Sequence, residues 1–271
     1  MSAIVQRWRD RRGTYRPAGE IIDPRRYDVA LIGDDNTAKA FVKQHHYSAT
    51  YPAARFRVGL YERMRGASSL VGVAIFSHPS NPLALRPLPV GLESVELGRF
   101  VLLDRVPGNG ETWFLARAFE LIAREGISGV VSFSDPCPRA TDEGLVVFGG
   151  HIGTIYQAHN AIYLGQARAD IMRLLPDGRT LHNRSLAKLR SRDQGWRYVL
   201  ESLLRYGATP PANTCQFDVD AWLGEWMPQL TRRVRHPGNH KYVWAFDGRA
   251  RKALSTIGRP YPKQVNVAVA A

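Results

Sequence analysis

Two apolar segments separated by a glycine-containing break, within residues 94–125, constrain the fold of this chain more than any other feature. Residues 95–103 form an apolar run rich in Val, Leu and Phe, which predicts a buried strand. After the break at residues 105–110, apolar side chains recur at helical spacing as far as Glu125. Glycines let the backbone approach a ligand closely, and the free N–H groups at a helix start favour anions. The sequence therefore predicts a mixed α/β fold with a cradle for an anion.

The glycine loop lacks the Lys-Ser/Thr pair of a P-loop, which excludes nucleotide hydrolysis of that type. Its position after a central strand resembles the pyrophosphate loop of the GNAT acyltransferases, which holds the diphosphate of acyl-coenzyme A. A plain turn that contains glycines by chance is the alternative. On the acyltransferase interpretation the cofactor is acetyl-CoA or another acyl-CoA. The residues expected to contact it are then Val101, Arg105, Gly108, Asn109, Gly110 and Thr112.

The charge balance of the chain points to a polyanionic partner. Lys and Arg number 37 against 24 Asp and Glu, which gives a formal net charge of +13. Such an excess favours nucleic acid as the partner, although a basic surface that is merely solvated is the alternative. The hydrophobic content of 44% with 23% charged residues is typical of a globular protein with a real core.

The cysteine content and the hydropathy pattern indicate the compartment. The two cysteines, Cys137 and Cys215, lack the paired spacing of a zinc finger or a disulfide scaffold, which fits a reducing cytoplasm. Charges recur throughout the N-terminal segment, so a signal peptide is not expected, and no window is long and apolar enough for a membrane helix. We therefore expect a soluble protein of the cytoplasm that does not contact a membrane. The oligomeric state is left open.

The predicted organisation is a basic N-terminal arm at residues 1–26, a core at 27–206 and a C-terminal extension at 207–271 that packs on the core. The arm either wraps the core, contacts phosphates or remains a mobile tail. Strands are expected at 27–33, 129–134, from about 163, and at 240–246, with hairpins formed by 55–62 with 70–77 and across the turn at 176–179. Helices are expected at 36–45 after Asp34 or Asp35, at 154–160, after Asn183 or Ser185, at about 196–207, and at 218–233. Residues 78–92 read as an irregular loop, and the chain after Gly258 as a tail.

Three constellations of polar residues could carry chemistry. They are the pair His45-His46 followed by Tyr47 at the end of the first helix, the segment 132–136 with Asp135 after a buried strand, and the segment 151–160 with Tyr156. Ligands collect at strand ends in open α/β sheets, so Asp135 is placed to act as a base or a ligand. Each constellation taken alone also fits a structural role: a hydrogen-bonded histidine, a turn opened by Asp before Pro, and a core tyrosine.

Taken together, the motifs resemble the Mom family. They are FVKQHHYS (41–48), VELGRFVL (95–102) with ETWFLARAF (111–119), SFSDP (132–136) and HIGTIYQAHNAIYLG (151–165), with a weaker echo in HKYVWAFDGRARKAL and RPYPK. The Mom family comprises bacteriophage enzymes that modify adenine in viral DNA, with a GNAT-like fold and a dependence on acyl-coenzyme A. The resemblance implies an α+β fold with a mixed, splayed sheet flanked by helices, extended by C-terminal helices and a hairpin. The basic arm and the region after Leu204 depart from the pattern and leave substrate choice open.

The resemblance also implies roles for individual residues. His46, Tyr47, Asp135 and Tyr156 would form the catalytic centre, with Arg99 on its cofactor side. An iron ion has been proposed for this family, which would make His46, Tyr47 and also Asp135 candidate ligands.

Four functions follow as hypotheses. The first is acyl-CoA-dependent conversion of adenine N6 to a methylcarbamoyl-type derivative that protects phage DNA from host restriction. Its substrate would be duplex DNA with a flipped adenine or single-stranded DNA, because a stacked base is out of reach. The others are an ordinary GNAT acetyltransferase acting on a small amine, one acting on a protein lysine, and a DNA-binding protein without catalysis.

Overall fold

The computed structural model describes residues 4–10, 12–17, 19–48, 50–215 and 217–263, and it divides the chain into two compact units. Unit 1 comprises Met1–Pro136, His151–Ala167 and Asn239–Ala271, and unit 2 comprises Cys137–Gly150 and Arg168–Gly238. This division differs from the predicted core and C-terminal extension, because the chain leaves unit 1 twice and returns to it. We describe each unit by itself.

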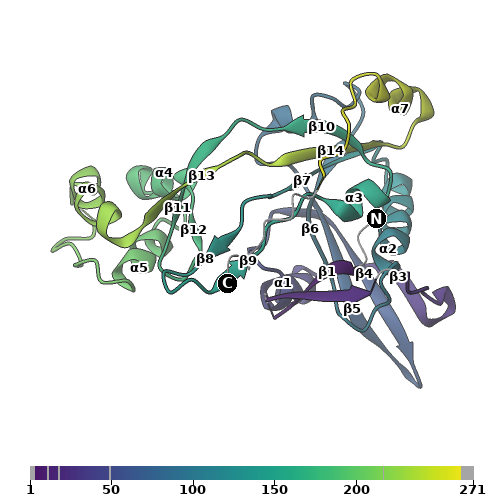
Figure 1. Cartoon of the computed structure of the whole chain (residues 1–271), viewed down its shortest axis with the longest axis horizontal. Coiled ribbons are helices and arrows are strands. Elements are labelled where there is room, and N and C mark those ends of the chain that lie inside the picture. Colours follow the sequence, from purple (N-terminus) through teal and green to yellow (C-terminus); the bar gives the residue numbers. More distant parts are fainter. Residues whose placement is uncertain (1–3, 11, 18, 49, 216, 264–271) are drawn as a thin grey trace. The chain divides into compact units, whose positions relative to one another are not determined.

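Unit 1 is built on a seven-stranded sheet in the order β10-β14-β7-β6-β5-β4-β3 (Figure 1). Neighbouring strands are antiparallel except β6 and β7, so the predicted mixed α+β architecture is confirmed. The C-terminal β14 is an inner strand, since it pairs with both β7 and β10. The strands are β3 (Tyr27–Leu31), β4 (Ala54–Met64), β5 (Ala67–Ser77), β6 (Ser94–Leu102), β7 (Gly129–Ser134), β10 (Ile162–Gln166) and β14 (His240–Ala245).

Helices cover both faces of this sheet because its inner strands are apolar on both sides. Helix α2 (Gly110–Arg124) packs Phe114 and Ile122 against one face, where Tyr156 of α3 (Thr154–Ala158) joins the same core. Helix α1 (Asp35–His45), capped by Asp34 as the sequence predicts, packs against β5. Helix α7 (Gly248–Ser255) packs Leu254 against strands β7 and β14.

The sheet opens between β6 and β7. These two strands pair over Ser94–Glu96 and Gly129–Val131 only, although β6 continues to Leu102. Beyond Glu96, a side-chain contact from Ser132 Oγ to the carbonyl of Leu97 at 3.0 Å joins them. The predicted splay of the sheet is therefore present, and it leaves the β7-facing edge of β6 without a paired strand.

The N-terminal segment forms a hairpin of β1 (Ile4–Arg9) and β2 (Arg12–Pro17). Arg7 of this hairpin is buried against the glycine loop, so the described part of the arm is held to unit 1 rather than free. Two 3-10 turns occur in this unit: Pro24–Arg26 at the end of the predicted basic arm, and Pro82–Leu85 in the loop that the sequence predicts to be irregular.

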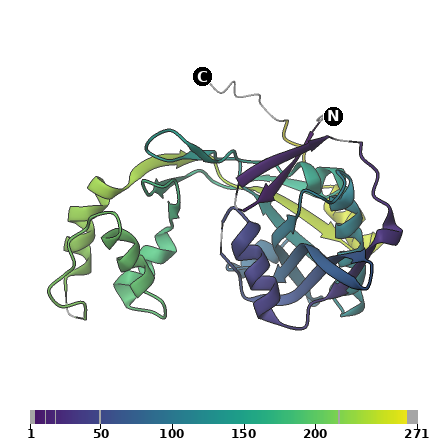
Figure 2. The ribbon, with the colours of Figure 1, turned by 90° about the horizontal axis from the view of Figure 1, so that it is seen from below.

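Unit 2 contains three helices, α4 (Asn183–Ser191), α5 (Arg197–Leu204) and α6 (Val219–Leu230), drawn in green in Figure 2. Their apolar faces form one core around Leu189, Leu203 and Trp222. A three-stranded sheet of β12 (Thr180–Leu181), β11 (Asp170–Leu174) and β13 (Arg232–His236) and a ribbon of β8 (Arg139–Ala140) and β9 (Val146–Phe148) complete it.

Three sequence predictions need correction. The helix predicted at 218–233 ends at Leu230, because Pro228 weakens its last turn and the basic segment Arg232–His236 pairs as a strand with β11. The residue that caps α4 is His182 rather than Asn183 or Ser185. Helix α7, capped by Asp247, was not predicted, since its short basic sequence carries a weak apolar pattern.

Two further observations concern the cysteines and the membrane. Cys137 is buried and Cys215 is exposed, and the two cysteines do not form a disulfide. Among the described helices, none is both long enough and apolar enough to cross a bilayer.

Candidate active site

Four of the predicted site residues come together where β6 and β7 diverge. Burial lowers the pKa of the Arg99 guanidinium, whereas its electrostatic interactions with Tyr47, Glu96 and Tyr156 raise it. Tyr47, Glu96 and Tyr156 therefore each lie within electrostatic range of Arg99. We call Arg99, Tyr47, Glu96, Tyr156 and the adjoining His46 the polar cluster.

Arg99 is fixed in this cluster by the segment after α1. Its Nε donates to the carbonyl of Thr50 at 2.9 Å, and its terminal nitrogens donate to the Thr50 hydroxyl and to the carbonyl of Gly98. A guanidinium held by three neutral acceptors keeps its charge uncompensated by those partners, so it can stabilise negative charge nearby.

His46 is a neutral hydrogen-bond donor at ordinary pH. It caps the C-terminal end of α1, and its side chain is buried. Burial places its pKa well below the usual value, and the charges of Arg99 and His151 lower it further. Nδ1 accepts the backbone N–H of Ser48 at 3.1 Å, so the proton of the neutral ring resides on Nε2.

Tyr47 links His46 to the end of β7. The rings of His46 and Tyr47 stack with centroids 4.2 Å apart, and the ring of His151 meets Tyr47 edge-on at 6.2 Å. The amide of His151 donates to the carbonyl of Asp135 at 2.8 Å. His151 therefore connects the polar cluster to the backbone of Asp135: its ring contacts Tyr47, and its amide bonds to the Asp135 carbonyl. Asp135 lies at the strand end where the sequence predicts a base.

The hydroxyl of Tyr156 is buried and stays protonated. Burial raises the pKa of its hydroxyl, while a hydrogen bond with Ser132 and the charge of Arg99 lower it and Glu96 raises it. Its ring packs edge-on against Tyr242 and Trp244, which fixes its direction. A buried phenol beside a guanidinium can donate a proton to a leaving group.

The glycine loop is occupied by the chain's own side chains. The amide of Gly108, which the sequence assigns to a diphosphate, donates instead to the Glu20 carboxylate at 2.8 Å. The amide of Gly110 donates to the carbonyl of Pro107 at 2.9 Å. Glu20 is itself paired with Arg16, and this pairing lowers the pKa of Glu20. A carboxylate thus takes the place that a phosphate oxygen would have.

Arg7 braces the same loop from within. Its guanidinium pairs with the buried carboxylate of Glu111 and donates to the carbonyls of Leu103 at 2.9 Å, Val106 at 3.1 Å and Pro107 at 2.8 Å. Burial raises the pKa of Glu111, and Arg7 counteracts this effect. The loop therefore directs carbonyl groups toward the hairpin.

The remaining predicted cofactor residues have structural partners. Arg105 bonds to Ser69 and Glu62, and Val101 is buried in β6. The side-chain oxygen of Asn109 accepts the amide of Ile22 at 2.8 Å, and the hydroxyl of Thr112 donates to the carbonyl of Asn109 at 3.1 Å. These contacts do not test cofactor binding, which stays a prediction for this loop.

The iron site that the resemblance implies at His46, Tyr47 and Asp135 stays a prediction. Among the described residues, no three His, Cys, Asp or Glu side chains lie together in a way that could bind a metal ion. Nδ1 of His46 is engaged by Ser48, and the neighbouring guanidinium of Arg99 disfavours a second cation. We therefore derive no step through a metal.

Sequence reasoning missed several polar residues that the structure brings into play. Glu96 lies between the apolar residues Val95 and Leu97 of β6, and Glu111 lies one turn before Phe114 and Leu115 on the buried face of α2. A carboxylate at an apolar position is the signal that would have found both. Glu20 and Arg7 gave no such signal, since they lie in a segment rich in charge.

Comparison with known proteins gives a family and a structural similarity. The model of the Mom protein family matches residues 26–263. No curated protein matches the chain. A solved structure described as a "Tandem GNAT protein from the clavulanic acid biosynthesis pathway (without AcCoA)" is similar, at 12% sequence identity and a TM-score of 0.35. That similarity covers 56% of this chain, and the chain spans about half, 48%, of that protein.

Proposed function

Since the chain belongs to the Mom protein family, we propose that it is a phage DNA-modification enzyme that transfers an acyl-CoA-derived group to adenine N6. The transfer gives an N6-acyl adenine, and this is a methylcarbamoyl-type derivative when the acyl group of the donor thioester already carries the methylcarbamoyl nitrogen. The modified base would protect the DNA from host restriction. The observation that carries the proposal is the polar cluster at the opening between β6 and β7, where Arg99 interacts electrostatically with Glu96, Tyr47 and the buried Tyr156.

The acyl transfer divides into roles that these residues can fill. The N6 lone pair is delocalised into the adenine ring, so the amine must be held close to the acyl carbonyl while a base removes its proton. As the N–C bond forms and the C–S bond breaks, the N6 proton goes to the Asp135 carboxylate. The hydroxyl of Tyr156, kept protonated by burial, supplies a proton to the departing thiolate.

Arg99 and His46 would stabilise the oxyanion that forms on the acyl carbonyl. His46 presents its N–H from a buried ring and Arg99 from a half-buried guanidinium, and such donors contribute more where water is excluded than they do in water. The neutral state of His46 suits this role, because its Nε2 then carries a proton that it can donate in a hydrogen bond.

The glycine loop can take a diphosphate only if Glu20 leaves the amide of Gly108. Entry of acyl-CoA would then exchange one anion for another at the same amide, with Arg16 released toward the diphosphate. The free edge of β6 beyond Glu96 offers backbone groups to the pantetheine arm.

Mass spectrometry of nucleosides tests the proposal. DNA from cells that make the wild-type chain should contain a modified adenine nucleoside, and DNA from cells that make Asp135→Ala should contain only adenine. Unmodified nucleosides in the presence of folded wild-type protein would overturn the proposal.

One observation favours a second function, a DNA-binding protein without catalysis. The amide of Gly108 is already bonded to Glu20, and Arg7 braces the loop through its carbonyls. On that alternative, coenzyme A would leave the thermal unfolding midpoint unchanged at every concentration, whereas a ligand bound by the native state would raise it.

A further inference from the structure

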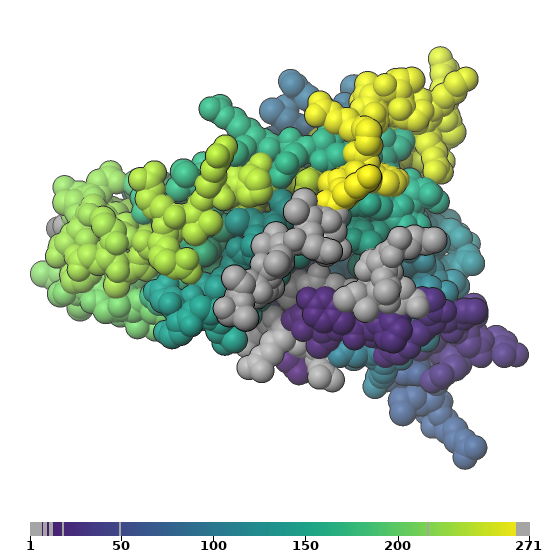
Figure 3. Space-filling view, in the orientation of Figure 1, coloured from purple at the N-terminus to yellow at the C-terminus, as the bar shows by residue number. Residues whose placement is uncertain are grey.

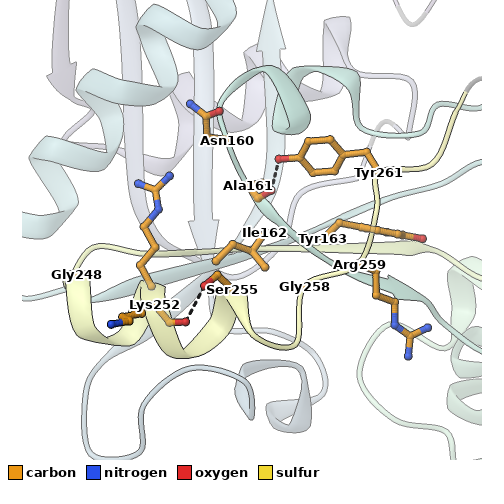
Figure 4. A pocket seen from close by; sticks show the side chains of 11 residues that line it. Asn160, Ala161, Ile162, Tyr163, Gly248, Lys252, Ser255, Gly258, Arg259 and Tyr261 are labelled. Carbon is orange, nitrogen blue, oxygen red and sulfur yellow. Dashed lines mark hydrogen bonds between the residues drawn. The ribbon is translucent and has the colours of Figure 1, made fainter.

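A cavity on the surface of unit 1 lies apart from the polar cluster. It has a volume of about 610 Å³ and is lined by residues of β10, of α7 and of the segment after α7 (Figure 4). In the space-filling view, α7 and the segment that follows it, both yellow, are seen on the surface (Figure 3). None of the residues that line the cavity belongs to the polar cluster or to the glycine loop.

All the charged side chains that line this cavity are cationic. Arg251, Lys252 and Arg259 contribute cations, and no carboxylate lines the cavity. Within the described part of the chain, no ion pair or hydrogen bond engages the charged groups of these three residues. The acidic residue nearest in sequence, Asp247, is used as the cap of α7, where it accepts the amide of Ala250 at 2.8 Å.

The chain holds the walls of the cavity in place. Tyr261 donates its hydroxyl to the carbonyl of Ala161 at 2.7 Å, and the amide of Arg259 donates to the carbonyl of Tyr163 at 2.8 Å. A Cβ atom at Gly165 would lie 2.9 Å from Nη1 of Arg259, and the φ of +103° at Gly165 suits glycine. Glycine at this position therefore makes room for the guanidinium.

A second, more apolar cavity adjoins the first. It has a volume of about 460 Å³, and it shares Asn160 and Arg251 with the basic cavity. Its lining includes the aromatic side chains of Phe119, Trp244 and Phe246. A basic cavity beside an aromatic one is the combination by which proteins hold a strand through its phosphates and its bases.

We propose that the basic cavity binds the phosphodiester backbone of the DNA substrate, with an unstacked base beside it in the aromatic cavity. The inference rests on the proposed function in taking DNA as the substrate. It adds a contact site on the side of the sheet formed by β10, β14 and α7. Tyr261, which is 42% exposed, offers a ring face to a neighbouring base.

Salt-dependent DNA binding tests the site with a charge-matched pair of variants. The first variant is Arg251→Gln/Lys252→Gln/Arg259→Gln. The second is Arg249→Gln/Lys43→Gln/Arg124→Gln, which removes the same charge from exposed positions of unit 1 outside both cavities; Arg249 lies on α7 itself. Affinity for a fluorescent single-stranded and a duplex oligonucleotide is measured by anisotropy across a range of salt concentrations.

The first variant should lower the slope of log K against log salt by roughly two to three and weaken binding roughly 10²-fold at 0.15 M salt. The second should retain the wild-type slope to within roughly one. Equal losses in the two variants would overturn the site, since long-range charge would then account for binding. The site would also be overturned if the first variant bound DNA as the wild type does but no longer showed a rise in unfolding midpoint on addition of coenzyme A. The cavity would then bind the cofactor instead of DNA.

The two proposals fail separately in this experiment. Selective loss of binding in the first variant while wild-type protein leaves nucleosides unmodified would support the site and contradict the enzyme. Normal modification with unchanged binding in the first variant would support the enzyme and contradict the site.

Discussion

Unit 1 and unit 2 differ in what they bury. All the polar residues that are buried in the described chain belong to unit 1: Arg7, His46, Glu62, Ser77, Ser94, Glu111, Ser132, Ser134 and His240. The core of unit 2 consists of apolar side chains alone, such as Leu189, Leu203 and Met227. Burying a charged or polar group costs free energy unless it is paired. We infer that the polar groups buried in unit 1, which cost free energy to bury, are present because they support chemistry. The core of unit 2 has a structural role: it stabilises the fold of that unit.

The largest expected effect is on catalysis in unit 1. Tyr156→Phe removes the proposed proton donor and keeps the ring, so modification of adenine should fall about 10²- to 10⁴-fold. Ser132 retains its bond with Leu97, which limits the loss of stability. Steady-state rates and a thermal unfolding curve of the same preparation measure both. An unchanged rate would remove Tyr156 from the mechanism.

Breaking the buried ion pair of unit 1 should destabilise that unit strongly. Arg7→Ala leaves the Glu111 carboxylate buried without its partner, and the expected loss is about 3–5 kcal/mol in denaturant unfolding. Arg25→Ala is the matched control, because Arg25 pairs with Asp23 at the surface and should leave the unfolding curve unchanged. Equal curves for the two variants would show that the hairpin does not brace the loop.

A core substitution in unit 2 should destabilise that unit and leave the stability of unit 1 unchanged. Leu203→Ala creates a cavity in a fully buried site, at an expected cost of about 2–5 kcal/mol. Ile171→Ala, at a position 41% exposed in the same unit, should cost less than about 0.5 kcal/mol. Hydrogen exchange should show the loss in unit 2 with protection of the unit 1 sheet retained. A parallel loss of protection in both would contradict the division.

The smallest effect concerns pH. The pKa of His46 in the folded chain lies well below its ordinary value, so the unfolded chain binds the proton more readily in the window below about pH 6.5. Stability should therefore fall as the pH drops through that window and be retained above it. His46→Gln should flatten this part of the profile of unfolding midpoint against pH, while the other histidines contribute equally to both proteins. An identical slope of unfolding midpoint against pH in the wild type and in His46→Gln would show that the His46 side chain is exposed to water rather than buried.

Much of the fold could be predicted because the apolar pattern is strong where the sheet forms. The strands around Val95, Val130 and Val243 and the hairpin of β4 and β5 follow directly from it. Helix α7 escaped prediction, since only Leu254 of its side chains is buried. The split of the chain into units also escaped, because strand pairing between β14 and β7 joins segments more than a hundred residues apart.

The candidate site was predictable in part for a related reason. His46, Tyr47, Arg99 and Tyr156 occur in recognisable motifs, and the structure brings them together. The use of the glycine loop was not predictable, because it depends on Arg7 and Glu20, whose contacts join distant parts of the chain. A loop that reads as an anion cradle in sequence can be filled by the protein's own carboxylate.

The most direct test of the account is transfer by purified protein. Acetyl-CoA labelled with a heavy isotope in its acyl group is incubated with DNA and wild-type protein, Tyr156→Phe or Arg249→Gln, and the nucleosides are analysed by mass spectrometry. We predict a labelled adenine nucleoside with wild type and Arg249→Gln and its loss with Tyr156→Phe. Label that is absent with wild type, or equal in all three proteins, would contradict the claim that the buried polar cluster of unit 1 modifies DNA.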